Sequence, residues 1–112
     1  MTHLPTILCT VVPQKAQRYD TVGDWPPEVG GVQQFVVSKT EFFDELATLI
    51  HEIVEWAWCK ENGITAKQVD EWDMGPGKLL EDPGSHDDCP YRDGHDIATS
   101  IVTGLFQMFG KL

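Results

Sequence analysis

The sequence predicts an α+β domain in which a short two-stranded, or slightly larger, sheet packs on a long helix, a short helix and a C-terminal helix. Three observations predict this class: two short β-branched segments near the N-terminus, a long amphipathic segment after them, and a second amphipathic segment near the C-terminus. The 112 residues are 41% hydrophobic and 23% charged. That composition suits a single domain, residues 1–112, with one modest core.

Both predicted strands lie in the first third of the chain. Thr6–Val12 reads TILCTVV, is rich in β-branched residues and stops at Pro13. Residues 33–37, with the sequence QQFVV, form the second strand, and the direction in which the two strands pair is left open. The glycines and prolines between them predict an irregular loop over residues 13–32.

A long helix is predicted over residues 39–62. Ser38 and Glu41 have the spacing of a capping box, and Gly63 provides the left-handed residue that ends a helix. Apolar residues recur along this segment with helical spacing, so we expect them to form its buried face. They are Phe42, Leu46, Leu49, Ile50, Ile53 and Ala57.

Two further helices follow. Thr65 can cap a short helix over Ala66–Asp73, and glycines and prolines predict a loop over residues 74–89. Pro90 suits the first turn of a last helix, residues 90–109, which Gly110 ends. The residues expected on its buried face are Ala98, Ile101, Val102, Leu105 and Phe109.

The charge balance excludes some classes of function. Eight Lys and Arg residues against eighteen Asp and Glu residues give a formal charge of −10, which argues against nucleic-acid and anionic-membrane partners. No apolar run is long enough to span a bilayer, and the N-terminus lacks a signal-peptide pattern, so a cytoplasmic protein is expected. Cys9, Cys59 and Cys89 have no metal or disulfide spacing. We expect them reduced, with Cys9 and Cys59 in the core or half-buried.

The strongest chemical signal is His51-Glu52-Ile53-Val54-Glu55 in the long helix. His51 and Glu55 are four residues apart, so both project from one face and could hold one metal ion. Glu52 lies about 100° further round the helix, where it could act on a water at that ion without ligating it. The pattern is HExxH with Glu55 in place of the second histidine. In HExxH metalloproteases the histidines bind zinc and the glutamate is the general base.

His95 is the best candidate for the third ligand, because it shares the side of the last helix that carries Ala98 and Val102. Two imidazoles and one carboxylate suit Zn²⁺, with Fe²⁺ or Mn²⁺ as alternatives. Nearby acidic residues could support the ligands or replace one of them. These are Asp87, Asp88 and Asp96.

The alternative is that His51 and Glu55 form a solvated pair opposite the apolar stripe. Ala47 and Trp58 lie on the His51 side, however, and favour a covered face.

Several other residues carry weaker signals. His86 is expected in a solvated turn or near the metal, and His3 is expected to be free. Tyr91 is expected either to cover the core or to stabilise an oxyanion. Arg92 is expected either to stabilise an oxyanion or to pair with Asp88 or Glu55. The expected packing residues are Trp25, Trp56 and Trp72.

The sequence resembles a family of small uncharacterised proteins encoded by tailed bacteriophages and prophages, over most of its length. The resemblance rests on residues 17–19, 21–25, 51–55, 82–84 and 90–91, with His95 and Ala98. More distantly, a strand followed by an HExx helix resembles the minimal core of zincin metallopeptidases. That likeness implies His51, Glu55 and His95 as metal ligands and Glu52 as the base. The phage resemblance implies the cytoplasm of the bacterial host.

These patterns lead to three alternative functions. The first is a peptidase-like hydrolase in which Glu52 moves the proton of a metal-activated water, residues 33–37 dock an extended peptide and Trp25 lines the cleft. The second is a non-enzymatic phage accessory or anti-host protein, with a structural metal or none, whose acidic surface binds a basic host partner or mimics nucleic acid. The third is a Mg²⁺-dependent nucleotide hydrolase, which the Glu52–Glu55 spacing supports only in part.

Overall fold

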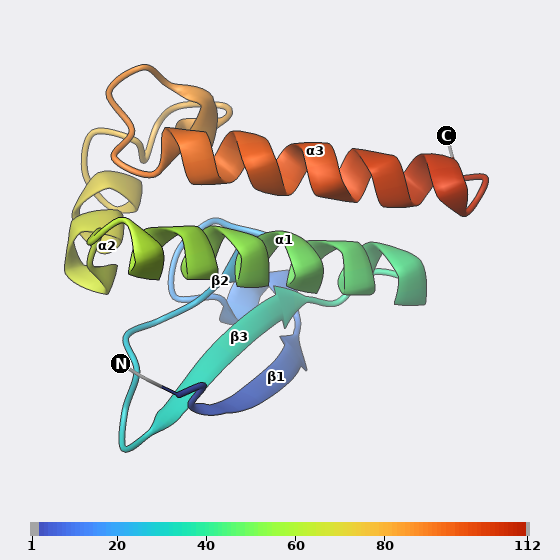
Figure 1. Ribbon diagram of the computed structural model, residues 1–112, viewed down its shortest axis with the longest axis horizontal. Helices are drawn as coiled ribbons and strands as arrows, with labels where there is room; N and C mark the ends of the chain where they lie inside the picture. The colour runs from blue at the N-terminus through green and yellow to red at the C-terminus, as the bar shows by residue number, and fades with distance from the viewer. Residues whose placement is uncertain (1–2, 112) are drawn as a thin grey trace.

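The structure is a computed structural model that describes residues 3–111 (Figure 1). In this part of the chain three strands precede three α-helices. They are β1 (Thr6–Val12), β2 (Gly23–Asp24), β3 (Val32–Ser38), α1 (Phe42–Glu61), α2 (Ala66–Asp73) and α3 (Arg92–Met108). Two 3-10 turns, η1 (Gln14–Ala16) and η2 (Pro83–Ser85), lie in the connections. The predicted α+β class is confirmed.

The sheet has the strand order β1-β3-β2. β1 runs parallel to β3, from the Thr6–Val32 pair to the Val12–Ser38 pair, whereas β2 is antiparallel to β3. Parallel strands need a long crossover, and residues 13–31 supply it. The prediction of an irregular segment there was therefore incomplete, because the crossover contains η1 and β2. β3 pairs with β1 along its whole length and with β2 only at Val36 and Val37, so the docking of an extended peptide on residues 33–37 stays a prediction.

The molecule has three layers, with α1 between the sheet and α3 (Figure 1). α1 packs on β3 and β2 with one side and on α3 with another. The central core cluster lies at the α2 end of this arrangement. It consists of Trp25, Phe35, Trp56, Cys59, Val69, Trp72, Cys89 and Tyr91. Phe35 and Trp56 meet edge to face with ring centroids 5.5 Å apart. The prediction that the three tryptophans are packing residues is confirmed.

The start of α1 differs from the prediction. Ser38 is the last residue of β3, where its hydroxyl donates to the carbonyl of Thr21, so it does not cap a helix. The helix begins at Phe42 without a side-chain cap on Glu41, and the carboxylate of Glu45 accepts from the backbone N–H of Thr40 instead. The strand pairing of Ser38 with Val12 overrides the local capping signal.

The buried face of α1 also differs from the predicted stripe. Its buried residues are Ala47, Glu52, Glu55, Trp56 and Cys59. Phe42, by contrast, is 79% exposed, and Ala57 is exposed as well. The reason is that α1 is covered both by the sheet and by α3, so the covered surface includes the polar His51 side. The interpretation of His51 and Glu55 as a solvated pair is therefore wrong.

The remaining elements agree more closely. Thr65 and Gln68 form a capping box at α2, and Gly63 has the left-handed φ of 70° that lets the chain leave α1. α3 starts two residues later than predicted, ends one residue earlier and buries Ala98, but Ile101 and the C-cap residue Phe109 are exposed.

The three cysteines are free thiols. Cys59 and Cys89 are buried. Cys9 is exposed on the edge strand β1, so the prediction that it is in the core or half-buried is wrong. Within residues 3–111 no helix is both long and apolar enough to cross a membrane.

Candidate metal centre

His51, Glu55 and His95 converge at the contact between α1 and α3. Nε2 of His51 lies 3.3 Å from Nδ1 of His95, and each of these nitrogens lies 3.4 Å from Oε2 of Glu55. The three atoms therefore form a nearly equilateral triangle. These are the three residues that the sequence predicts as ligands, and in the structure their side chains form a group that could hold a metal ion.

The dimensions of this triangle suit a small divalent ion. A tetrahedral ion with bonds of about 2.0–2.1 Å has its ligand atoms about 3.3–3.4 Å apart, which is the spacing found here. Hydrogen bonding alone accounts for the triangle less well. Both imidazoles can donate to Oε2 of Glu55, but the two donating ring nitrogens then face each other across 3.3 Å, so the His51–His95 edge is left without a hydrogen bond. A cation at the centre faces all three lone pairs.

Packing of two helices brings His95 to the other two ligands. His51 and Glu55 are one turn apart on α1, while His95 lies in the first turn of α3. Gly94 permits the close approach, since a Cβ there would come within 2.8 Å of the Trp58 ring. Gly84 in η2 packs even more closely on the His95 imidazole. The site is therefore held by α1, α3 and the η2 turn together.

Groups around the triangle hold two of the three ligands in place. Oδ1 of Asp82 lies 3.4 Å from Nε2 of His95, the ring nitrogen that points away from the triangle. The indole Nε1–H of Trp25 donates to Oε1 of Glu55 over 3.3 Å. Such outer partners fix the orientation of metal ligands in known metal sites. Trp25 thus lies behind Glu55 and does not line the cleft, contrary to the prediction.

The acidic residues predicted as alternative ligands do not reach the triangle. Asp87 and Asp96 both pair with Arg92, at 3.0 and 3.9 Å, and Asp88 lies beside His86. All of these acidic side chains are exposed. Arg92 therefore pairs with neither Asp88 nor Glu55, and His86 stays in a solvated turn as one of its two interpretations predicted.

The three ligands perturb one another electrostatically. Burial opposes ionisation of Glu55, but hydrogen bonds and charge from His51 and His95 outweigh it and lower the pKa of Glu55. In turn, the hydrogen bond to Glu55 raises the pKa of His95 against the effect of burial. Glu55 is thus favoured as the anion, which is the form that ligates a cation.

Glu52 lies beside the triangle with a different environment. Its side chain packs on Gly23 of β2. A Cβ at Gly23 would collide with the side chain of Glu52, so this contact requires glycine. It is only 9% exposed, and no side chain or backbone group of residues 3–111 donates a hydrogen bond to it. Burial first, and then the negative charges of Glu55, Asp24 and Asp73, raise the pKa of Glu52. Glu52 lines the cleft beside the triangle, so its carboxyl is accessible from that side.

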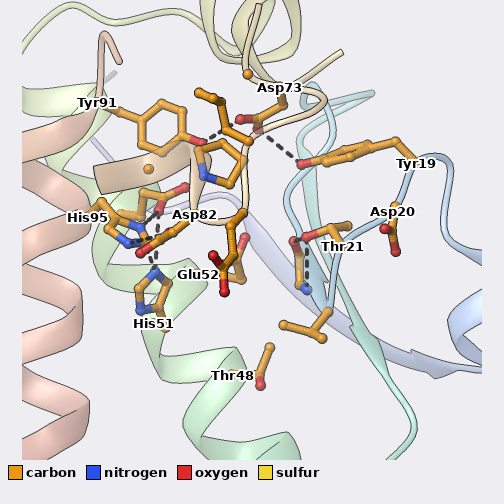
Figure 2. Close-up of a pocket in the computed structure, with 18 of the residues that line it drawn as sticks. Tyr19, Asp20, Thr21, Thr48, His51, Glu52, Asp73, Asp82, Tyr91 and His95 are labelled. Atoms are coloured by element: carbon orange, nitrogen blue, oxygen red, sulfur yellow. Dashed lines mark hydrogen bonds and ion pairs between the residues drawn. The ribbon is translucent and has the colours of Figure 1, made fainter. Parts of the chain in front are cut away.

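A cleft of about 1010 Å³ opens beside these residues. Its walls come from α1, from the crossover around residues 18–23, from the segment 77–84 and from α3. Figure 2 shows His51, Asp82 and His95 together at one side of the cleft, Tyr19 and Thr21 at the other, and Glu52 between them. The triangle therefore opens onto the cleft.

Asp73 lies between two tyrosines at one end of the cleft (Figure 2) and accepts hydrogen bonds from both, Tyr19 at 3.0 Å and Tyr91. Burial raises the pKa of Asp73 to about 6, although both phenols oppose this shift. Tyr91 is buried in the core cluster, so it covers the core as one of its two interpretations predicted.

Sequence reasoning missed Asp73, Asp82 and Tyr19, and it misplaced Trp25. Asp82 lies 13 residues from its partner His95, and Trp25 lies 30 residues from Glu55. The residues of each pair are too far apart in the sequence to form a local motif. Their contacts are therefore visible only in the folded structure.

Comparisons with known proteins add nothing to this geometry: no protein-family model, no curated protein and no solved structure matches the chain. The resemblance to phage proteins and to zincins therefore stays a prediction.

Proposed function

We propose that this protein binds a divalent metal ion on His51, Glu55 and His95 and uses it as a peptidase-like hydrolase. The observation that carries the proposal is the triangle of three ligand atoms with edges of 3.3–3.4 Å. We also propose that the protein is of phage origin, on the resemblance of its motifs alone.

The ligand set favours zinc. Two imidazoles and one carboxylate are a common ligand set of catalytic zinc, and Fe²⁺ and Mn²⁺ also accept this combination. Mg²⁺ prefers oxygen ligands, and two of the three atoms here are nitrogens. The nucleotide-hydrolase alternative is therefore less well supported than the zinc site.

The position of the triangle favours catalysis over a purely structural ion. Structural zinc sites are closed by four protein ligands, whereas catalytic sites keep one position open. Here three ligands converge, and the side chains of His51 and His95 are 20% and 16% exposed beside the cleft. A substrate in the cleft could approach the ion directly.

Glu52 is suited to the role of general base. A divalent ion bound at the triangle would supply a Lewis acid that activates water for attack on a carbonyl carbon. Glu52 would accept the proton of that water and pass it to the leaving amine. The positive charge of the ion would favour ionised Glu52, opposing the burial and the acidic neighbours that now raise its pKa.

The direct test is metal content, measured by elemental analysis of protein purified without added metal or an affinity tag. We expect one zinc per chain in the unaltered protein and a loss of zinc in His51→Ala and in His95→Ala. His86→Ala is the matched control, because His86 is exposed and pairs with Asp88 away from the triangle. Thermal melts of all variants separate lost ligation from misfolding. Retention of zinc by both ligand variants would rule out the site.

A further inference from the structure

The cleft beside the triangle is strongly acidic. Among the described residues, seven acidic side chains line it and only two basic ones. The acidic residues are Asp20, Asp44, Glu52, Glu55, Asp73, Glu81 and Asp82, and the basic ones are Arg18 and Lys78. Even with a divalent ion at the triangle, the cleft would keep a net negative charge.

The two basic residues do little to offset this charge. The guanidinium of Arg18 is held by Asp24, at 2.6 and 2.9 Å, and by Asp70, at 2.8 and 2.9 Å. Neither of those carboxylates belongs to the cleft lining. Acidic groups outside the cleft therefore neutralise the charge of Arg18. Lys78 is exposed at the wall formed by residues 77–84.

The acidic residues occupy two levels of the cleft. Four of them are exposed and form what we call the acidic rim: Asp20, Asp44, Glu81 and Asp82. Below the rim, Glu52 is buried to more than nine-tenths, lines the cleft and has no hydrogen-bond donor among residues 3–111. A carboxylate offers about four acceptor positions, so it can serve both a water at the triangle and a donor on a bound ligand.

We propose that the cleft recognises a peptide through lysine or arginine side chains, which the acidic rim attracts and the unpartnered carboxyl of Glu52 helps to receive. This inference rests on the proposed function, because it names the substrate class of the same cleft. A field of one sign between low-dielectric walls concentrates ligands of opposite charge and repels those of like charge. An acidic peptide would meet repulsion at the rim and a second carboxylate at its base.

The test is binding of two labelled peptides, hexalysine and hexaglutamate, to the zinc-loaded full chain, followed by fluorescence anisotropy. We expect hexalysine to bind and hexaglutamate not to bind, with the affinity falling as salt is raised because rim charges are exposed to screening. Equal binding of both peptides would overturn the inference.

A matched pair of double variants locates the binding. Asp44→Asn with Glu81→Gln removes two rim charges, whereas Glu61→Gln with Asp88→Asn removes two exposed charges outside the cleft lining. The rim variant should weaken hexalysine binding about tenfold and the control variant less than about twofold. Equal weakening by the two variants would mean a general attraction to an acidic protein and would also overturn the inference.

Metal content is measured on the same samples, so the two proposals fail separately. Zinc without peptide selectivity overturns this inference and leaves the metal site standing. Selectivity for hexalysine that depends on the rim, in a chain that takes up no zinc, supports the acidic cleft and overturns the proposed function.

Discussion

Oδ1 of Asp82 lies 3.4 Å from Nε2 of His95, on the side of the ring that faces away from Glu55 and His51. When a cation binds Nδ1, a carboxylate in this position favours the ring tautomer with the proton on Nε2. Nδ1, the atom 3.3 Å from His51, is then left with a lone pair. Asp82 is thus a positioning residue for the proposed ligand.

The first prediction follows from this contact. Asp82→Asn should weaken zinc binding by about tenfold to a hundredfold, because the amide is a poorer partner for the ring N–H. Competition with a chromophoric chelator measures the affinity. Asp87→Asn is the control, since Asp87 pairs with Arg92 away from the triangle. An unchanged affinity in the Asp82 variant would show that this contact does not support the metal.

The second prediction separates binding from catalysis. Glu52→Gln should keep zinc but lose at least about a hundredfold in hydrolysis of a fluorogenic peptide, because the amide cannot take a proton from water. Elemental analysis checks the metal and initial rates check the activity. A fully active variant would exclude Glu52 as the base.

The third prediction concerns metal removal. An ion present at a hundred times its dissociation constant adds about 2.7 kcal/mol to the free energy of unfolding, so a chelator should lower the melting temperature by roughly 10 °C. The double variant His51→Ala with His95→Ala provides the control, because its melting temperature should not respond to the chelator. A response of equal size in that variant would place the metal elsewhere.

The fourth prediction uses the buried carboxyl of Asp73. Its pKa is raised from 3.8 to about 6, so the unfolded chain releases this proton near pH 4 while the folded chain holds it until about pH 6. The folded state therefore binds more protons between these values, and this group makes stability fall as pH rises through that window, by about 3 kcal/mol. Urea unfolding of Asp73→Asn from pH 4 to pH 7 should show a flatter profile than the unaltered chain. Identical slopes would contradict the assignment.

The fifth prediction tests the packing that brings the ligands together. Gly94→Ala places a methyl group 2.8 Å from the Trp58 ring, so it should destabilise the protein by about 1–3 kcal/mol and weaken zinc binding as α3 shifts from α1. Gly104→Ala is the matched control, because a Cβ there meets nothing within 4 Å. That variant should be neutral or stabilising by up to about 1 kcal/mol. Equal behaviour of the two would mean that Gly94 is not a contact point.

The sequence predicted those features that depend on neighbouring residues. The spacing of His51 and Glu55 and the capping box at Thr65 are local patterns, and both appear in the structure. His95 was found because a histidine beside Ala98 had to face inward. Long-range pairing decided the rest. The local pattern predicts that Ser38 caps a helix, whereas in the structure Ser38 pairs with Val12 and belongs to a strand.

The buried face of α1 shows the same limit in another form. Hydrophobic periodicity identifies a side that avoids water, but it does not reveal that a second layer covers the polar side as well. Glu52 and Glu55 are buried because α1 lies between the sheet and α3, and Trp25 reaches Glu55 from 30 residues away. Neither the burial of these glutamates nor the contact with Trp25 can be predicted from a short segment of the sequence.

The triangle joins positions 44 residues apart in the chain, one on each of two packed helices. An ion shared between them would act as a reversible cross-link of the folded chain, because its ligands come together only when the two helices pack. The three free thiols form no covalent cross-link. The supply of zinc would then set the stability of the fold as well as the proposed activity.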